Sequence, residues 1–113
     1  MKLIKLAIII AICALAYNLN AQKVYSCSSK YDADVKVWVA DSKYDADLVV
    51  FKCSSKYDAT DNKGLWFFVD SKYDADKKIF FVDSKYDADV KIYFTDSKYD
   101  AQWRETNKKH LFY

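Results

Sequence analysis

A pentapeptide, SKYDA, recurs six times and occupies most of the chain. Its copies begin at residues 29, 42, 55, 71, 84 and 97. The interval is 13 residues except between the third and fourth copies, where it is 16. A period this short means that each unit is one supersecondary element that cannot bury its apolar face alone. The units must therefore pack against one another to form a common core.

Each unit combines a start signal for a helical turn with a short strand. Ser29 stands three residues before Asp32, which is the spacing of a capping box, and the following segment 35–39 is β-branched and aromatic. Structural turn caps are predicted at Ser29, Asp32, Ser42, Asp45, Ser55, Asp58, Ser71, Asp74, Ser84, Asp87, Ser97 and Asp100. The sequence therefore predicts a mainly β domain with short helical turns, built from about six turn-plus-strand repeats.

The predicted strands are apolar on both faces. One face collects Val35, Val37, Val39, Leu48, Val50, Trp66, Phe68, Ile79, Phe81, Val90, Ile92 and Phe94, and we expect it to be the core. The opposite face carries Trp38, Phe51, Phe67, Phe80 and Tyr93, flanked by lysines. A sheet of this kind needs a second cover. We expect the turns to supply it, with each SKYDA tyrosine laying its ring on the sheet.

The third unit is longer than the others. Its three extra residues lie within 60–64, which includes Gly64, the single glycine of the protein. Polar residues and glycine between two strands predict a surface loop.

The first 21 residues have the pattern of an export signal. A basic start precedes a short apolar run and then small residues suited to cleavage. We expect a signal helix at 1–21 and one compact SKYDA-repeat domain at 22–113, with cleavage after Ala21 or, as the alternative, after Ala16. The mature chain would be periplasmic or extracellular, with no membrane association after cleavage.

The charge of the mature chain is balanced. The full sequence has 18 basic and 16 acidic residues, and the first 21 residues hold two lysines and no acids, which leaves 16 against 16. Lysines and aspartates also alternate through the chain, unlike the clustered basic surface of a nucleic-acid-binding protein. We expect a monomer without a nucleic acid partner.

The residues form no constellation for catalysis or metal binding. His110, the single histidine, lies in the irregular tail beside lysines, and the repeated serines are equivalent to one another rather than one unique nucleophile. The aspartates lack the glycine turn and the distant glutamate of an EF-hand, and a lysine accompanies every copy. The sequence predicts no enzyme, no cofactor and no metal site, with a calcium-stabilised domain as the remaining alternative.

Two cysteines of the repeat region, Cys27 and Cys53, stand two residues before a repeat serine and occupy equivalent positions. An even count in an exported protein allows one disulfide. The other reading is two free buried thiols that pack as small hydrophobes.

Six SKYDA copies, each leading into a strand at intervals of about 13 residues, resemble the septoil-knot domain family of bacterial proteins. The resemblance covers residues 23–103. It implies a compact β-rich fold with a deeply knotted backbone of seven crossings, and no enzymatic activity. The tail Arg104–Tyr113 departs from the repeat, so its last residues either add an edge strand or remain loose.

The sequence thus predicts an exported, small and stable structural or interaction module whose partner is a protein or a glycan. The alternative is a glycan- or peptide-binding module that uses exposed aromatics such as Trp103. Aromatic residues at regular strand positions are more often core. Three or more rings exposed on one surface would favour binding.

Overall fold

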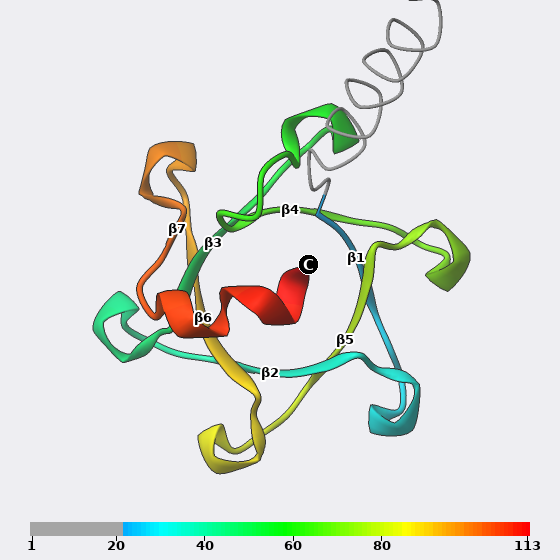
Figure 1. Ribbon diagram of the computed structural model, residues 1–113, viewed down its shortest axis with the longest axis horizontal. Helices are drawn as coiled ribbons and strands as arrows, with labels where there is room; N and C mark the ends of the chain where they lie inside the picture. The colour runs from blue at the N-terminus through cyan, green and yellow to red at the C-terminus, as the bar shows by residue number, and fades with distance from the viewer. Residues whose placement is uncertain (1–21) are drawn as a thin grey trace, which may run out of the picture.

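Six parallel strands close into a barrel (Figure 1). In the computed structural model, which describes residues 22–113, they are β1 (Lys23–Ser26), β2 (Val35–Val39), β3 (Leu48–Lys52), β4 (Leu65–Phe68), β5 (Lys77–Phe81) and β6 (Val90–Thr95). The order around the barrel is β4-β1-β5-β2-β6-β3, and the pairing of β3 with β4 closes the ring. The expected signal segment 1–21 lies outside the described residues.

One turn of 3₁₀ helix follows each strand of the series as far as β6. These turns are η1 (Lys30–Asp32), η2 (Lys43–Asp45), η3 (Lys56–Asp58), η4 (Lys72–Asp74), η5 (Lys85–Asp87) and η6 (Lys98–Asp100). We call them, with the flanking serine and alanine, the corners; they project outward around the barrel (Figure 1). The predicted β-rich architecture of turn-plus-strand repeats is confirmed.

Strands that are consecutive in sequence are not neighbours in the barrel, with β3 and β4 as the exception. β1, for instance, pairs with β4 and β5. Antiparallel neighbours can be joined by a tight hairpin, whereas parallel neighbours need a long crossover connection. Here the crossovers contain other strands of the same barrel. The units are therefore interleaved, and most strands lie between two strands that are distant in sequence.

The barrel interior is filled by the face that was predicted to be the core. The fully buried residues of that face are Val35, Val37, Leu48, Val50, Trp66, Ile79, Val90 and Ile92. Val24 and Phe112, which the sequence did not predict, complete the core. Val39 departs from the prediction, since it is 39% exposed at the last position of β2. The equivalent position in β3 is Lys52, whose Nζ lies 4.4 Å from the centre of the Phe94 ring.

The corners contact neighbouring strands but leave the outer face of the barrel only partly covered, since Trp38, Phe51, Phe67, Phe80 and Tyr93 remain half-buried. η1 packs against β5, η2 against β6 and η5 against β2. The SKYDA tyrosines take no part in this, because Tyr31, Tyr44, Tyr57, Tyr73, Tyr86 and Tyr99 are between 76% and 97% exposed. That part of the prediction is wrong. In four units a second aspartate, which follows the alanine, bonds to a neighbouring strand instead, and in the third unit Ala59 is fully buried.

A reciprocal pair of hydrogen bonds, which we call the aspartate clasp, ties four corners to a neighbouring strand. The N–H of Asp34 donates to the carbonyl of Lys78 at 2.7 Å, and the N–H of Lys78 donates to the Asp34 carboxylate at 3.0 Å. The same exchange joins Asp47 to Lys91, Asp76 to Lys23, and Asp89 to Lys36. Each clasp links residues 44 or 53 positions apart.

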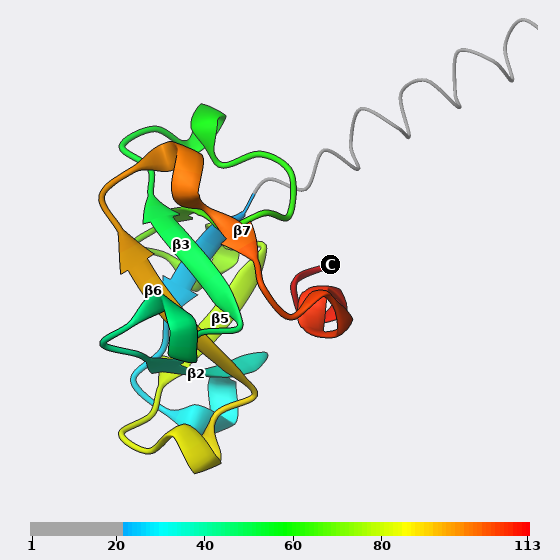
Figure 2. The ribbon, with the colours of Figure 1, turned by 90° about the vertical axis from the view of Figure 1, so that its left-hand side faces the viewer.

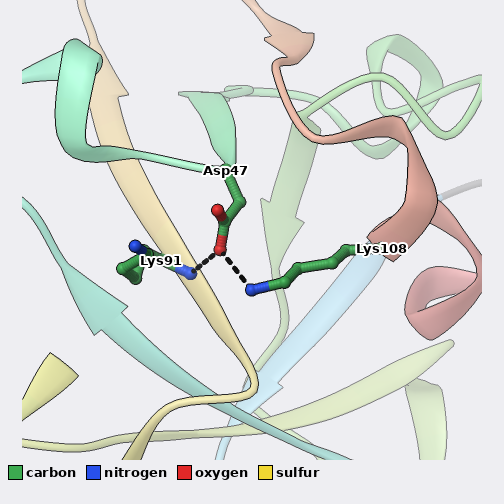
Figure 3. A network of polar contacts seen from close by, with 3 residues as sticks. All are labelled: Asp47, Lys91 and Lys108. Carbon is green, nitrogen blue, oxygen red and sulfur yellow. Dashed lines mark hydrogen bonds and ion pairs between the residues drawn. The ribbon is translucent and has the colours of Figure 1, made fainter. Parts of the chain in front are cut away.

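The clasp at Asp47 also holds the C-terminal tail (Figure 3). Its carboxylate is nearly buried and accepts both the Lys91 N–H and the Lys108 ammonium, each at 2.9 Å. Its carbonyl accepts the N–H groups of Arg104 and Glu105. A buried carboxylate is stable only with such partners, so Asp47 fixes the tail to the barrel.

The insertion in the third unit is a loop with Asp61 and Lys63 at the surface, as predicted, but its buried Asn62 also makes it a clamp. Asn62 is 3% exposed and accepts the Trp103 indole N–H through both its carbonyl and its side-chain oxygen, at 3.0 and 3.1 Å. Its side-chain amide donates to the carbonyl of Lys109 at 2.8 Å. Gly64 continues the pairing of β3 with β4 by accepting the N–H of Phe51. The insertion is thus built into the place where the ring closes.

The tail Arg104–Tyr113 is neither an edge strand nor loose, because it forms η7 (Thr106–Phe112) directly after the short strand β7 (Gln102–Trp103). β7 pairs antiparallel with β3, and η7 lies across one end of the barrel (Figures 1 and 2). Phe112 is 1% exposed and packs 5.2 Å from the Trp66 ring and 5.9 Å from the Trp103 ring, between ring centres. Gln22 donates its side-chain N–H to the Phe112 carbonyl at 3.1 Å. The penultimate residue of the chain is therefore a plug of the core.

We predict that Gly64→Ala destabilises the domain by at least about 2 kcal/mol. Gly64 has φ +94°, and a Cβ added there would lie 2.2 Å from the carbonyl oxygen of Val49. The measurement is urea unfolding followed by tryptophan fluorescence. Lys63→Ala is the matched control, because this neighbouring side chain is solvent-exposed and should shift the free energy by less than about 0.5 kcal/mol. Equal effects of the two substitutions would contradict the clamp.

The clasp predicts a difference between the two aspartates of one corner. Asp89→Ala should cost about 1 to 2 kcal/mol, because the Lys36 N–H loses its acceptor. Asp87→Ala should cost less than about 0.5 kcal/mol, since its exposed carboxylate accepts no hydrogen bond. Asp89→Asn keeps a carbonyl acceptor and should recover part of the loss. The unfolding free energies of the three variants check this, and a cost at Asp87 as large as that at Asp89 would refute it.

Candidate functional site

The corner serines have a structural role. Ser29, Ser42, Ser55, Ser71 and Ser84 each accept, through Oγ, the N–H of the tyrosine two residues later at 3.2 or 3.3 Å. The sixth corner differs, since Ser97 makes no side-chain cap. There Thr95 Oγ1 accepts the Ser97 N–H at 3.2 Å and donates to Asp100 at 3.3 Å. Serine at this position is explained by turn formation alone.

The first aspartate of each corner contributes its backbone, not its carboxylate, to the turn. The N–H of Asp32 donates to the carbonyl of Ser29 at 3.2 Å, and the other corners repeat this bond. The capping-box spacing suggested that this carboxylate accepts a hydrogen bond from the backbone N–H of the capping serine. Within residues 22–113, none of the six corners makes that bond. The carboxylates of Asp32, Asp45, Asp58, Asp74, Asp87 and Asp100 are exposed.

The lysine and tyrosine of every corner are exposed, and in five corners they contact one another. In five corners the lysine Nζ lies 5.4 to 5.7 Å from the centre of the adjacent tyrosine ring. An exposed cation–π contact of this kind contributes about 0.5 to 1 kcal/mol. This is too little to explain why both residues stand in every corner.

Grooves separate neighbouring corners around the barrel. Their volumes are about 380 Å³ between η3 and η4, 380 Å³ between η4 and η1, 350 Å³ between η1 and η5, and 290 Å³ between η2 and η6. Each is lined by one corner on either side. Concave sites of this volume are large enough for a small ligand.

The two walls of each of these grooves carry opposite charges, and the order of the charges around the barrel is the same in all four. A corner lysine lines one wall, and the first aspartate of the next corner lines the other: Lys56 with Asp74, Lys72 with Asp32, Lys30 with Asp87, and Lys43 with Asp100. None of these pairs closes to an ion pair, since the two ion pairs within residues 22–113 are Lys63–Asp61 and Lys108–Asp47. The charges remain apart across open space.

Strand residues of the outer face complete two of the grooves. Phe67 and Lys23 are register partners in β4 and β1, and both line the groove between η3 and η4. Phe80 and Lys36 are register partners in β5 and β2, and line the groove between η1 and η5. Both phenylalanines lie on the face that the sequence placed opposite the core, but the turns that were expected to cover this face leave grooves there. No local sequence signal links Lys23 with Phe67 or Lys36 with Phe80, because the members of each pair are 44 residues apart.

Cys27 and Cys53 are both buried free thiols. They follow β1 and β3, which are not paired in the barrel. Burial raises the pKa of both thiols above the ordinary 9.0, and nearby aspartates, Asp32 for Cys27 and Asp58 for Cys53, raise it further. The thiols therefore stay protonated near neutral pH and are weak nucleophiles.

The remaining candidates for chemistry are separate from one another. His110 is exposed, with Nδ1 2.9 Å from the carbonyl of Asn107. Between residues 22 and 113, no three His, Cys, Asp or Glu side chains are grouped as metal ligands. The same part of the chain contains no helix of the length and apolarity needed to cross a membrane.

Comparison with known proteins places the chain by its fold. The family model described as the 7(1) septoil knot domain matches residues 21–104, which extends from the first described strand to the residue after β7. No curated protein and no solved structure matches the chain. The match spans most of the sequence and all six corners, so the protein is a small structural module that belongs to the septoil knot domain family.

Proposed function

We propose that the protein is an exported and durable structural module without catalytic activity, and that resistance to unfolding is its useful property. The observation that carries this proposal is the interleaving of the barrel. Clasped residues lie 44 or 53 positions apart in sequence, so separating one strand disturbs two distant units. Little of the structure can then open by itself.

Such an arrangement favours kinetic stability. Contacts between distant segments are slow to form because the loop-closure entropy must be paid first. Such contacts also break together. A segment can open locally only where few contacts hold it, and this barrel has few segments of that kind. The plug at Phe112 and the clamp at Asn62 close one end. The operational stability of such a protein is an unfolding rate.

A threaded backbone would raise that barrier further. The resemblance to the family implies a seven-crossing knot, and we extend that proposal to this chain. True knots are essentially absent from ordinary folds. A knotted chain must unthread, in addition to losing its contacts, before a protease can bind it in extended form.

Digestion of the folded full chain with proteinase K at neutral pH tests the proposal. We expect a fragment close to residues 22–113 to persist for hours at a protease concentration that removes an unfolded control within minutes. Labelling of Cys27 and Cys53 by iodoacetamide, in a Cys13→Ser background, should be much slower than in the urea-unfolded chain, because each residue is 8% exposed. Phe112→Ala is the informative variant, since it removes the plug and should accelerate both digestion and labelling. Rapid digestion of the unaltered folded domain would contradict the proposal.

Export has its own test. The full chain, produced in a Gram-negative host, should be recovered in the osmotic-shock fraction with an amino terminus at Gln22, or at Tyr17 if cleavage follows Ala16. Intact mass spectrometry of the purified protein distinguishes these ends. Recovery in the cytoplasm with residues 1–21 attached would show that the segment is no export signal.

A further inference from the structure

The corners repeat more than the fold requires. The serine caps the turn, the alanine packs against a strand, and the second aspartate forms the clasp. By contrast, the corner lysine, the tyrosine and the first aspartate are exposed, and their contacts are weak. Six copies of an exposed set that stability does not need point to a use at the surface.

The exposed tyrosines do not form a flat aromatic platform. Each stands on a separate corner, and the corners project in different directions around the barrel (Figure 1). The corners therefore do not form a single surface with three adjacent exposed rings, which was the expected sign of glycan binding. The concave features between the corners are the alternative.

Two grooves combine all the features of a polar binding site. The groove between η3 and η4 is lined by Lys23, Lys56, Phe67, Asp70, Ser71 and Asp74. One repeat later, the groove between η1 and η5 is lined by Lys36, Lys30, Phe80, Asp83, Ser84 and Asp87. Five of the six positions carry the same residue at an interval of 13, and the sixth is a corner lysine in both. The same site is built twice.

The charge of these two grooves restricts the ligand. Each contains two lysines and two aspartates, so its formal charge is zero. A polyanion would meet the two carboxylates, and a cation would meet the two ammonium groups. A neutral ligand that carries both donors and acceptors meets no such opposition. Lysine ammonium and serine hydroxyl groups donate, and carboxylates accept.

The phenylalanine adds an apolar surface to the polar walls. Phe67 and Phe80 are half-buried on the outer face of their strands, so part of each ring remains accessible in the groove. Ligand sites commonly combine such an apolar contact with a few polar groups that fix orientation. Sugars have this combination, because an apolar ring face is bordered by hydroxyl groups.

We propose that the grooves between η3 and η4 and between η1 and η5 are two independent sites for a neutral oligosaccharide, each taking one or two sugar units. Corners η4 and η1 lie between the two sites in the order around the barrel (Figure 1). One protein thus holds two glycan chains. This proposal goes beyond that of a durable module, since it assigns the module a ligand: it would connect two polysaccharide chains.

Isothermal titration of the full chain with cellohexaose and with chitohexaose tests the proposal, with dextran sulfate as the polyanion. We expect saturable binding of at least one neutral hexasaccharide with a stoichiometry of two. Lys30→Ala and Asp87→Ala alter one groove at exposed positions. Each should weaken that site at least about tenfold and reduce the observable stoichiometry to one. The corresponding pair in the other groove, Lys56→Ala and Asp74→Ala, should do the same there.

Lys98→Ala is the matched control, because this corner lysine lines neither of the two grooves. It should leave both sites unchanged. Absence of binding to both hexasaccharides, or unchanged binding in the groove variants, would overturn the proposal, as would binding of dextran sulfate alone. Protease resistance is measured without sugar, so failure of this proposal and failure of the durable-module proposal are distinguishable.

Discussion

Parallel pairing between segments far apart in sequence is the constraint on which the whole structure depends. Two parallel strands cannot be joined by a hairpin, and this chain uses its own remaining strands as the connections. The aspartate clasp makes that pairing specific, because Asp34 exchanges both of its hydrogen bonds with Lys78 in a strand three units away. The corners are held in place by the same bonds, so the grooves between them are a direct product of the strand order.

The repeat is broken where the ring closes. Thr60 and Gln102 replace the clasp aspartate in the third and sixth units, which precede β4 and β7. Asn62 and the tail substitute for the missing clasps, since Asn62 bonds to Trp103 and to the Lys109 carbonyl. A perfectly regular repeat would give every unit the same contacts, so it would not specify between which two strands the ring closes. The irregular residues therefore carry as much structural information as the regular ones.

The sequence predicted what depends on neighbouring residues. Serine three residues before aspartate, followed by β-branched residues, is sufficient for a turn and a strand, and alternation along each strand identified the inner face. Strand order was out of reach, because six nearly identical strands offer many pairings that alternation cannot rank. The role of the second aspartate was also out of reach, because its hydrogen-bond partner lies 44 or 53 residues away in the sequence. The prediction for the corner tyrosine was wrong because it was based on the apolar ring and neglected the phenol hydroxyl, which favours exposure. The alanine and the second aspartate make the contacts with the strands instead.

The strand order also bears on how such a chain could cross a membrane. β1 has no sheet partner until β4 and β5 have been synthesised, and β2 waits for β5 and β6. The one pairing between consecutive strands, β3 with β4, spans two register positions. Hardly any of the sheet can form early, and the core lacks Phe112 until that residue has been synthesised. If the chain is exported as we propose, its interleaved strand order keeps the emerging polypeptide unfolded, and therefore able to thread through a translocon, until the late strands have been made.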